Sequence, residues 1–199
     1  MRSSRLPPPV WSVVEDLAAH DRITAAHCER VAQLAEAVAA ELGLSVEERA
    51  LARDAGVLHD IGKLEISSAL LNKEGRLGRE ERLLLDRHAH SGAELLLGID
   101  PRLHDLADVI ASHHERLDGS GYPRGLRGDE ITPVSRIVAT ADVYDALVAE
   151  RPYRSRPFTR VEACGYLTAN AGQLFDARCV GALLAVTSTD AFPAEADEH

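Results

Sequence analysis

Residues 113–123 have the sequence His113-His114-Glu115-Arg116-Leu117-Asp118-Gly119-Ser120-Gly121-Tyr122-Pro123. Adjacent histidines on a helix diverge by about 100°, so a hydrophobic core seldom accommodates both, whereas a metal cluster approached from one side can use both. Glycine admits a positive φ and proline fixes φ, so the segment after the histidines can hold a fixed shape close to a ligand. The stretch therefore predicts a metal-binding edge with a loop over it.

The composition describes one acidic domain. The chain has 199 residues, of which 45% are hydrophobic, enough for one well-packed domain but few for two. Its formal net charge of −10 argues against a nucleic acid polymer as partner. Cys28, Cys164 and Cys179 are odd in number and form no CxxC pair, which disfavours a disulfide framework or a thiolate zinc site. The sequence has neither a signal peptide pattern nor a long apolar run, so we expect a cytoplasmic protein without a membrane span.

Helix signals run along the whole chain. Asp21 is a candidate N-cap for a helix that Gly43 ends, and Ser45 opens a capping box for a helix that leads to His59 and Asp60. A long helix is expected over 79–97, another from 100 to 114, and others from 133 to about 149, from 159 and over 179–186. Because no alternating strand pattern of useful length appears, the sequence predicts an all-α fold, a compact single-domain helical bundle.

The chain is expected to divide into three parts. Residues 1–20 form a tail, disordered over 1–9, and a short amphipathic helix that packs on the bundle or against a second subunit. Residues 21–187 form the catalytic domain, and the acidic residues 188–199 form a disordered tail. Only about twenty residues precede Asp21, too few for a sensor domain, so we expect a stand-alone enzyme.

Seven polar side chains could be directed at one point in such a bundle. A lone histidine is more often a core or surface residue than a ligand, but a set of this size is hard to explain structurally. Imidazole and carboxylate ligands without thiolate suit iron, manganese, zinc or nickel. The set exceeds what one ion needs, whereas two ions that share a carboxylate would use all of it and could activate a bridging water for attack on phosphorus. The candidate ligands are His27, His59, Asp60, His88, His113, His114 and Asp142.

These motifs resemble the HD-GYP family, a branch of the HD superfamily of metal-dependent phosphohydrolases. His59 to Lys63 resembles the HD signature, His88 to Gly92 the HxxxG element, and His113 to Pro123 the HHExxDGxGYP signature. Residues 141–147 look like the downstream segment with the metal aspartate, and residues 151–154 like the basic segment after it. The resemblance runs from about residue 21 to about residue 186, with the motifs in the family's order.

The resemblance implies an HD-type helical bundle that hydrolyses cyclic di-GMP to linear pGpG, and sometimes on to GMP, with two divalent ions. Iron or manganese is expected, with zinc or nickel as alternatives. One ion would be held by His27, His59, Asp60 and Asp142, and Asp60 would bridge to a second ion held by His88, His113 and His114. Ile23 stands where three-metal members place a glutamate, and it cannot bind metal, so two ions are expected rather than three. His88 is preferred to His90 because Gly92 follows it by four residues.

Four further side chains are candidates for work beside the metals. Lys63 and Asp60 are the expected catalytic residues, with Lys63 contacting the scissile phosphate or protonating the leaving oxygen. The alternative for Lys63 is a cation that complements a helix C-terminus. Arg151 and Arg154 match the family's basic segment and would clamp phosphate and guanine. Tyr122 either stacks on a base or packs the loop.

Asp118 has two interpretations. It could orient a metal histidine from behind, as carboxylates often do. It could equally cap the turn that the Asp-Gly pair predicts.

Two alternatives to the leading function stay open. The same site could hydrolyse another cyclic dinucleotide, such as 3',3'-cGAMP. A different class is a non-catalytic module that senses cyclic di-GMP or docks onto a GGDEF-type synthase through residues 119–123. The complete ligand set favours the enzyme, because receptors that have lost activity usually lack ligands. A homodimer formed through the N-terminal helix is a further expectation.

Overall fold

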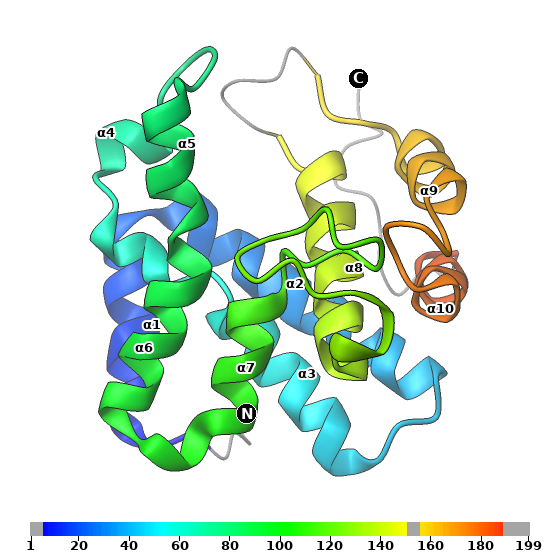
Figure 1. Cartoon of the computed structure of the whole chain (residues 1–199), viewed down its shortest axis with the longest axis horizontal. Helices are drawn as coiled ribbons and strands as arrows, with labels where there is room; N and C mark the ends of the chain where they lie inside the picture. Colours follow the sequence, from blue (N-terminus) through cyan, green and yellow to red (C-terminus); the bar gives the residue numbers. More distant parts are fainter. Residues whose placement is uncertain (1–5, 151–155, 189–199) are drawn as a thin grey trace.

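The computed structural model describes residues 6–150 and 156–188, most of which lie in helices (Figure 1). The N-terminal half contains α1 (Pro8–His20), α2 (Arg22–Glu41), α3 (Val46–Leu58), the 3-10 helix η1 (Ile61–Glu65), α4 (Ser68–Leu71), α5 (Arg79–Asp86) and α6 (His88–Ile99). The C-terminal half contains η2 (Pro101–Leu103), α7 (His104–Ser112), η3 (Gly128–Glu130), α8 (Pro133–Val148), α9 (Arg160–Ala169) and α10 (Ala177–Thr187). Within these ranges the only β-type pairing is isolated bridges, so the all-α prediction is confirmed.

The predicted helix starts are observed with the expected cap chemistry. The Asp21 carboxylate accepts hydrogen bonds from the backbone N–H groups of Ile23 and Thr24. Ser45 and Thr159 each form a complete capping box with the glutamate three residues later, and Thr132 accepts from Ser135 N–H. These bonds satisfy donors that a helix N-terminus leaves without partners, which is why the sequence signals were reliable here.

The prediction of one continuous helix over 79–97 is wrong. Two helices, α5 and α6, meet at Arg87, and α6 continues past Gly98 to Ile99. Arginine is a good helix former, so nothing in the local sequence predicts the break. The break allows the His88 ring to donate through Nδ1 to the carbonyl oxygen of Leu85, at 2.5 Å.

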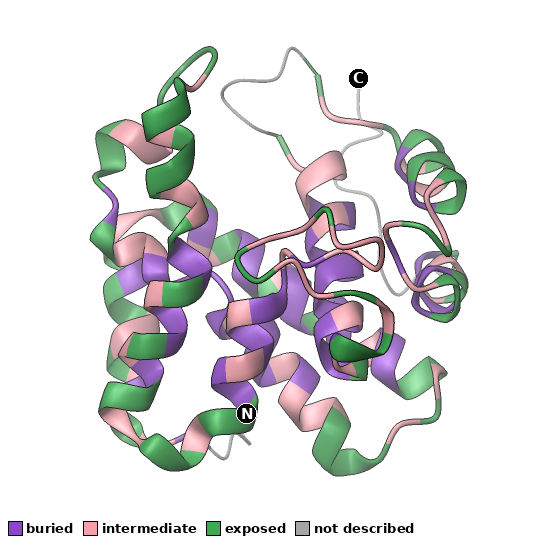
Figure 2. Cartoon of the chain, viewed as in Figure 1, coloured by how far each residue is buried: buried purple, intermediate pink, exposed green. Residues whose placement is uncertain are grey.

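Helix α2 forms the centre of the bundle and packs against α1, α3, α8 and α10. Its buried face includes Val31, Ala35 and Val38, which belong to one hydrophobic core (Figure 2). Helix α3 lies close to α2 because Gly56 faces the backbone of Ala32, where a Cβ atom would clash. This close approach fixes the relative positions of the two helices that carry His27 and His59.

Helix α1 packs on the bundle, one of the two arrangements expected for it. Val10 and Leu17 are almost fully buried in the main core, and the helix contacts both α2 and η1. Leu6 is buried and α1 starts at Pro8, so the expectation of disorder over 1–9 is wrong for residues 6–9. Residues 189–199, expected to be a disordered tail, lie outside the described residues. No helix in the described ranges is long and apolar enough to span a membrane.

Candidate metal centre

The seven predicted ligands come from six separate helical elements and meet in the interior. His27 lies within α2, His59 is the C-cap of α3, and Asp60 is the N-cap of η1. His88 is the first residue of α6, His113 is the C-cap of α7 with His114 after it, and Asp142 lies in α8. All are buried except His114, which is partly exposed. The sequence prediction thus named residues that the fold brings together.

His27, His59 and Asp142 form one group of potential ligand atoms. The His27 Nε2 atom lies 3.0 Å from Asp142 Oδ1, and His59 Nε2 lies 3.9 Å from the same oxygen. The His27 and His59 rings meet edge to face, with centroids 5.2 Å apart. Two imidazole nitrogens therefore face one carboxylate in a buried space.

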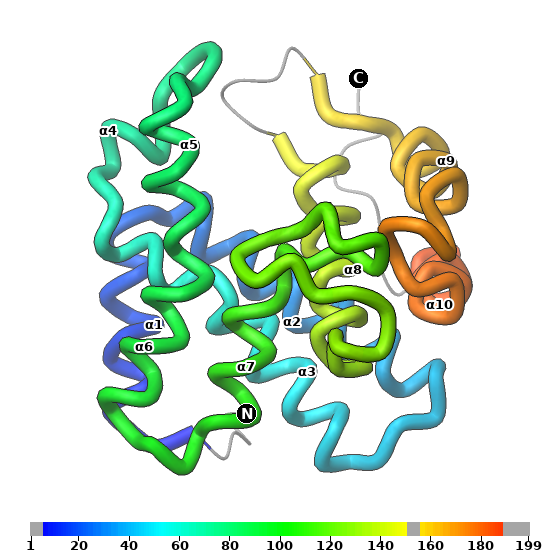
Figure 3. The backbone as a smooth tube through the Cα atoms, in the orientation of Figure 1, coloured from blue at the N-terminus to red at the C-terminus, as the bar shows by residue number. Residues whose placement is uncertain are grey.

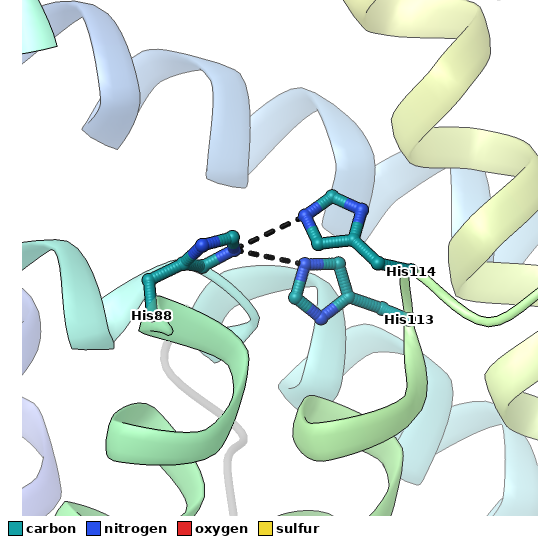
Figure 4. A group of neighbouring side chains, drawn as sticks. All are labelled: His88, His113 and His114. Atoms are coloured by element: carbon teal, nitrogen blue, oxygen red, sulfur yellow. Dashed lines mark hydrogen bonds between the residues drawn. The ribbon is translucent and has the colours of Figure 1, made fainter. Parts of the chain in front are cut away.

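His88, His113 and His114 form a second group (Figure 4). His88 Nε2 lies 3.3 Å from His113 Nε2 and 3.1 Å from His114 Nε2. In Figure 4 the His88 ring points from α6 toward the two rings at the end of α7. Helix α7 ends at Ser112, before the expected end at residue 114, and the two adjacent histidines after it both face the cluster.

Asp60 lies between the two groups and presents one oxygen to each. Its Oδ2 atom is 3.4 Å from His59 Nε2, and its Oδ1 atom is 3.2 Å from His88 Nε2. Lys63 donates to Oδ2 at 2.5 Å. A carboxylate in this position can serve two ligand groups at once.

Hydrogen bonds behind the rings fix four of the imidazoles. The Nδ1 atom of His59 is 2.8 Å from the carbonyl oxygen of Gly56, and that of His113 is 2.6 Å from the carbonyl oxygen of Ile110. His88 makes the same kind of bond, and His27 Nδ1 donates to Asp145 Oδ2 at 2.6 Å. A carbonyl or carboxylate oxygen only accepts, so Nδ1 carries a proton in all four rings. The neutral form of each ring then keeps the Nε2 lone pair for a metal.

The interior nitrogens are suited to a cation. With Nδ1 protonated, the Nε2 atoms of His88 and His113 are both acceptors, and two acceptors 3.3 Å apart cannot bond to each other. His59 Nε2 is buried and has no hydrogen-bond partner. Nitrogen ligands of one ion, each about 2.0–2.1 Å from it, lie roughly 3–4 Å apart, which these separations match. These ligand atoms therefore fit a divalent transition metal ion.

The protonation states favour the same conclusion. Burial and the neighbouring histidines lower the pKa of His113 well below its ordinary value, and burial lowers the pKa of His114 to about 3. Burial alone would raise the pKa of Asp60, but Lys63 and His59 lower it well below its ordinary value. For Asp142, burial is likewise outweighed, first by the neighbouring His27 and then by His59, so its pKa is also lowered well below its ordinary value. At neutral pH His113 and His114 are therefore neutral and Asp60 and Asp142 are ionised, the forms that bind metal.

Two glycines of the predicted motifs hold the centre together. A Cβ atom on Gly62 would clash with the His88 carbonyl group and with Gly92 N. A Cβ atom on Gly92 would lie 3.0 Å from Gly62 N and 3.3 Å from Ile61 Cγ1. The turn after Asp60 and the first turns of α6 thus pack backbone to backbone, which brings His88 to Asp60.

Of the other candidate residues, some lie beside the ligand cluster and others do not. Lys63 contacts Asp60, and the Tyr122 ring lies against the His114 ring with centroids 4.7 Å apart. His90 is exposed beside Glu94, so His88 is the histidine of α6 that enters the cluster. Arg151 and Arg154 lie outside the described residues.

Asp118 has the turn role, not contact with a metal histidine. Its carboxylate accepts from Ser120 N–H at 2.9 Å, and its backbone pairs with Arg127. The adjacent Gly119 has a φ of 80°, as this tight turn requires. The loop geometry therefore points Asp118 to its own backbone.

Asp145 is the main site residue that sequence reasoning missed. It accepts from His27 Nδ1 and from both Nε and a terminal nitrogen of Arg30, at 2.7 and 3.0 Å for the arginine bonds. The available signal was a second carboxylate three residues after Asp142, which lies on the same side of a helix. Cys28 also lies near His59 and Asp60, but burial raises the pKa of its thiol well above the ordinary value, so it stays protonated.

Comparison with known sequences gives a family match over most of the chain. The model of the HD domain family matches residues 12–179. The chain is 48% identical over 162 residues to "Cyclic di-GMP phosphodiesterase response regulator RpfG" of Xanthomonas campestris pv. campestris (strain 8004), a match that covers 81% of this chain and 43% of that protein. It is 43% identical over 161 residues to "3'3'-cGAMP-specific phosphodiesterase 3" of Vibrio cholerae serotype O1 (strain ATCC 39315 / El Tor Inaba N16961), covering 80% of this chain and 34% of that protein. The chain thus spans less than half the length of these relatives.

Solved structures show the same fold at lower identity. "Bd1817, a HDG"Y"P protein from Bdellovibrio bacteriovorus" aligns with a TM-score of 0.68 and 23% identity, over 83% of this chain and 52% of that chain. The cyclic GMP-AMP specific phosphodiesterase V-cGAP3 of V. cholerae aligns with a TM-score of 0.65 and 20% identity, over 90% of this chain and 48% of that chain. The predicted type of helical bundle is confirmed by these alignments.

Proposed function

Because the chain belongs to the HD domain family, in its HD-GYP branch, we propose that it is a metal-dependent phosphodiesterase that hydrolyses cyclic di-GMP to linear pGpG, with GMP as a further product. The observation that carries the proposal is Asp60, whose two oxygens face two separate histidine groups. An HD domain implies the use of divalent metal. We propose two ions, because two ions that share a carboxylate suit phosphodiester cleavage. Imidazole and carboxylate ligands suit iron or manganese, the proposed metals, with zinc or nickel as alternatives.

Each ion has its own proposed ligand set. His27, His59, Asp60 and Asp142 would hold one ion, while His88, His113 and His114 would hold the other with Asp60 as the bridge. When bound, two such ions lower the pKa of a shared water and stabilise charge on the phosphate oxygens. The chain's contribution is orientation, since the hydrogen bonds donated by Nδ1 fix four rings before any metal arrives.

Lys63 and Tyr122 are the proposed substrate contacts among the described residues. Burial alone would lower the pKa of Lys63, but Asp60 raises it above its ordinary value, so the ammonium group keeps its proton at neutral pH. Lys63 can then bind the scissile phosphate or donate a proton to the leaving oxygen. Burial raises the pKa of Tyr122, which keeps its phenol neutral beside His114, suited to stacking on guanine. Arg151 and Arg154 stay proposed phosphate and guanine contacts by their motif.

A second cyclic dinucleotide is supported by a specific observation. The relative from V. cholerae, at 43% identity, is named as a 3'3'-cGAMP-specific phosphodiesterase. The same ligand groups would serve either substrate, because both carry phosphodiester bonds and purine bases. Cyclic di-GMP is the leading substrate, since it is the one named for the relative at 48% identity.

The test is a paired measurement of metal and turnover. The protein would be purified without air, the metal per chain measured, and the hydrolysis of cyclic di-GMP followed beside that of 3',3'-cGAMP. We expect about two ions per chain and faster hydrolysis of cyclic di-GMP. His88→Ala should lose one ion and nearly all turnover, while His90→Ala, an exposed control two residues away, should keep both. Nucleotide binding without product under added manganese or iron(II) would make the chain a sensing module instead.

We also propose two protein partners. A GGDEF-type synthase would dock at residues 119–123, and a second copy of the chain would form a homodimer. Light scattering of the purified protein tests the homodimer, and a monomer at all concentrations would reject it. Co-purification with a GGDEF domain, compared between the parent and Ser120→Arg, tests the docking.

A further inference from the structure

Glu115 is a buried carboxylate that the ligand set does not use. It follows His113 and His114 directly, and its residue is 2% exposed. Its Oε1 atom accepts from Arg124 N–H at 2.7 Å, and its Oε2 atom accepts from Leu126 N–H at 3.0 Å. Both oxygens are thus bound to backbone donors on the returning part of the loop between α7 and α8 (Figure 3).

The same part of the loop is fixed a second time through Arg124. The Arg124 side chain donates to Ser112 Oγ at 2.5 Å and to Asp108 Oδ1 at 2.9 Å, both on α7. Residues 124–126 are therefore tied to the end of the helix that carries His113. A carboxylate that binds two backbone N–H groups in a buried place holds its partners more tightly than a neutral side chain would.

Before it reaches Arg124, the loop crosses the backbone of residues 114–116, next to the metal-binding histidines. A Cβ atom on Gly121 would clash with the backbone of His114 to Arg116, so the chain can pass there only as glycine. Tyr122 N–H donates to the carbonyl oxygen of His114 at 3.3 Å. The Tyr122 ring then lies against the His114 ring. The position of the ring depends on where the loop is held on either side of it.

We infer that Glu115 is a positioning residue for substrate binding, which holds Tyr122 over His114 by binding the backbone of Arg124 and Leu126. The inference rests on the proposed function and says how Tyr122, a proposed substrate contact, is held in place. Both oxygens of the Glu115 carboxylate bind the loop backbone, so loss of this carboxylate should displace Tyr122 and leave the metals bound.

The test is a double-mutant cycle on turnover and binding. Glu115→Gln keeps the size of the side chain but turns an NH₂ group toward a backbone donor, so one of the two bonds is lost. We expect the KM for cyclic di-GMP to rise about tenfold, with kcat changed much less and the metal content unchanged. Tyr122→Ala should give a similar rise, and the double variant should be no worse than Tyr122→Ala alone. Glu130→Gln is the matched control, because Glu130 also accepts a backbone N–H in this loop but is exposed.

Two results would overturn the inference. One is a loss of metal or of kcat in Glu115→Gln with an unchanged KM, which would place its effect on the histidines. The other is additive effects of the two substitutions. Hydrogen exchange at the backbone N–H groups of Arg124 and Leu126 tests the positioning role without turnover. Even if the parent protein hydrolyses no cyclic dinucleotide, Glu115→Gln must speed this exchange. Unchanged exchange would reject the positioning role.

Discussion

At the scale of single residues, the ligand cluster depends on the groups that orient it. His27 carries a hydrogen bond to Asp145, and Asp145 is itself held by Arg30. A carboxylate behind a metal histidine fixes the ring and raises its basicity. The strength of metal binding should therefore depend on a residue that binds no metal.

Asp145→Asn tests this dependence. The amide keeps the shape but removes the charge that His27 and Arg30 share, so we expect metal affinity to fall by about 10–100-fold. Titration of the metal-free protein with manganese, followed by calorimetry, measures the change. Asp105→Asn, an exposed carboxylate beside His104, is the control and should leave the affinity unchanged. Equal affinities for the Asp145 variant and the parent would contradict the assignment.

The histidines also predict how the metal-free protein responds to pH. Burial lowers the pKa of His114 from 6.5 to about 3, and that of His113 is lowered well below 6.5. As the pH falls below 6.5, the unfolded chain takes up protons that these folded rings refuse, so stability is lost. His59 acts in the opposite sense: burial alone would lower its pKa, but Asp60 and Asp142 raise it. Two lowered groups outweigh one raised group, and the free energy of unfolding should fall from pH 7 to pH 5.

Urea unfolding in the presence of a chelator measures this slope. His114→Gln removes one of the two titrating groups, so its slope should be shallower by up to about 1.4 kcal/mol per pH unit. Asp60 and Asp142 stay ionised across this range because their pKa values are lowered well below 3.8. A slope that is identical in parent and variant would show that His114 titrates normally in the folded chain.

The sequence predicted those site residues that are neighbours along the chain. His59-Asp60 and His113-His114 are adjacent in the chain, so their joint use could be predicted. The contact of Asp145 with His27 joins residues 118 positions apart, and no local pattern predicts it. The suggestion that Asp118 orients a metal histidine was wrong for the opposite reason. The local hydrogen bond that its carboxylate accepts from Ser120 N–H, within the Asp-Gly turn, replaces a distant contact.

At the scale of helices, the centre depends on the close contact between η1 and α6. Gly62 and Gly92 face each other where these elements cross, and the contact sets the distance from Asp60 to His88. Caps predicted most helix starts, because a cap is local chemistry. The break at Arg87 was missed because no glycine or proline marks it; at the break, His88 Nδ1 donates to the carbonyl oxygen of Leu85.

Gly62→Ala should separate the two elements. Its methyl group has no room beside the His88 carbonyl group, so we expect a loss of about 1–3 kcal/mol in stability and a clear drop in bound metal. Gly98→Ala is the matched control on α6, because a Cβ atom there meets nothing within 4 Å. The control should gain about 0.5–1 kcal/mol, since alanine favours a helix. Thermal unfolding and metal analysis of both variants measure the difference, and full metal content in Gly62→Ala would refute the packing argument.

At the scale of the whole molecule, residues from six helical elements reach one buried centre. A change that loosens the core should therefore also loosen the metal centre. The all-α class followed from patterns along the chain. The position of α1 could not be predicted in this way, because an amphipathic helix can pack either on its own bundle or against a second subunit. In the structure Val10 and Leu17 are buried in the same core that supports α2.

Removing residues 1–18 should therefore damage the metal centre from a distance. The deletion takes Val10 and Leu17 out of the core, where the loss of one large apolar side chain alone costs about 2–5 kcal/mol. Helix α1 also packs on η1, and the His20 ring bonds to the carbonyl oxygen of Ile66 at 2.8 Å, just after the turn that contains Lys63. We expect a lower Tm and less bound metal, with the point variant Leu17→Ala intermediate and the exposed Asp16→Ala unchanged. If the truncated chain kept its Tm, metal content and turnover, α1 would be an appendage, because a helix that completes the core cannot be removed without cost to the centre built on it.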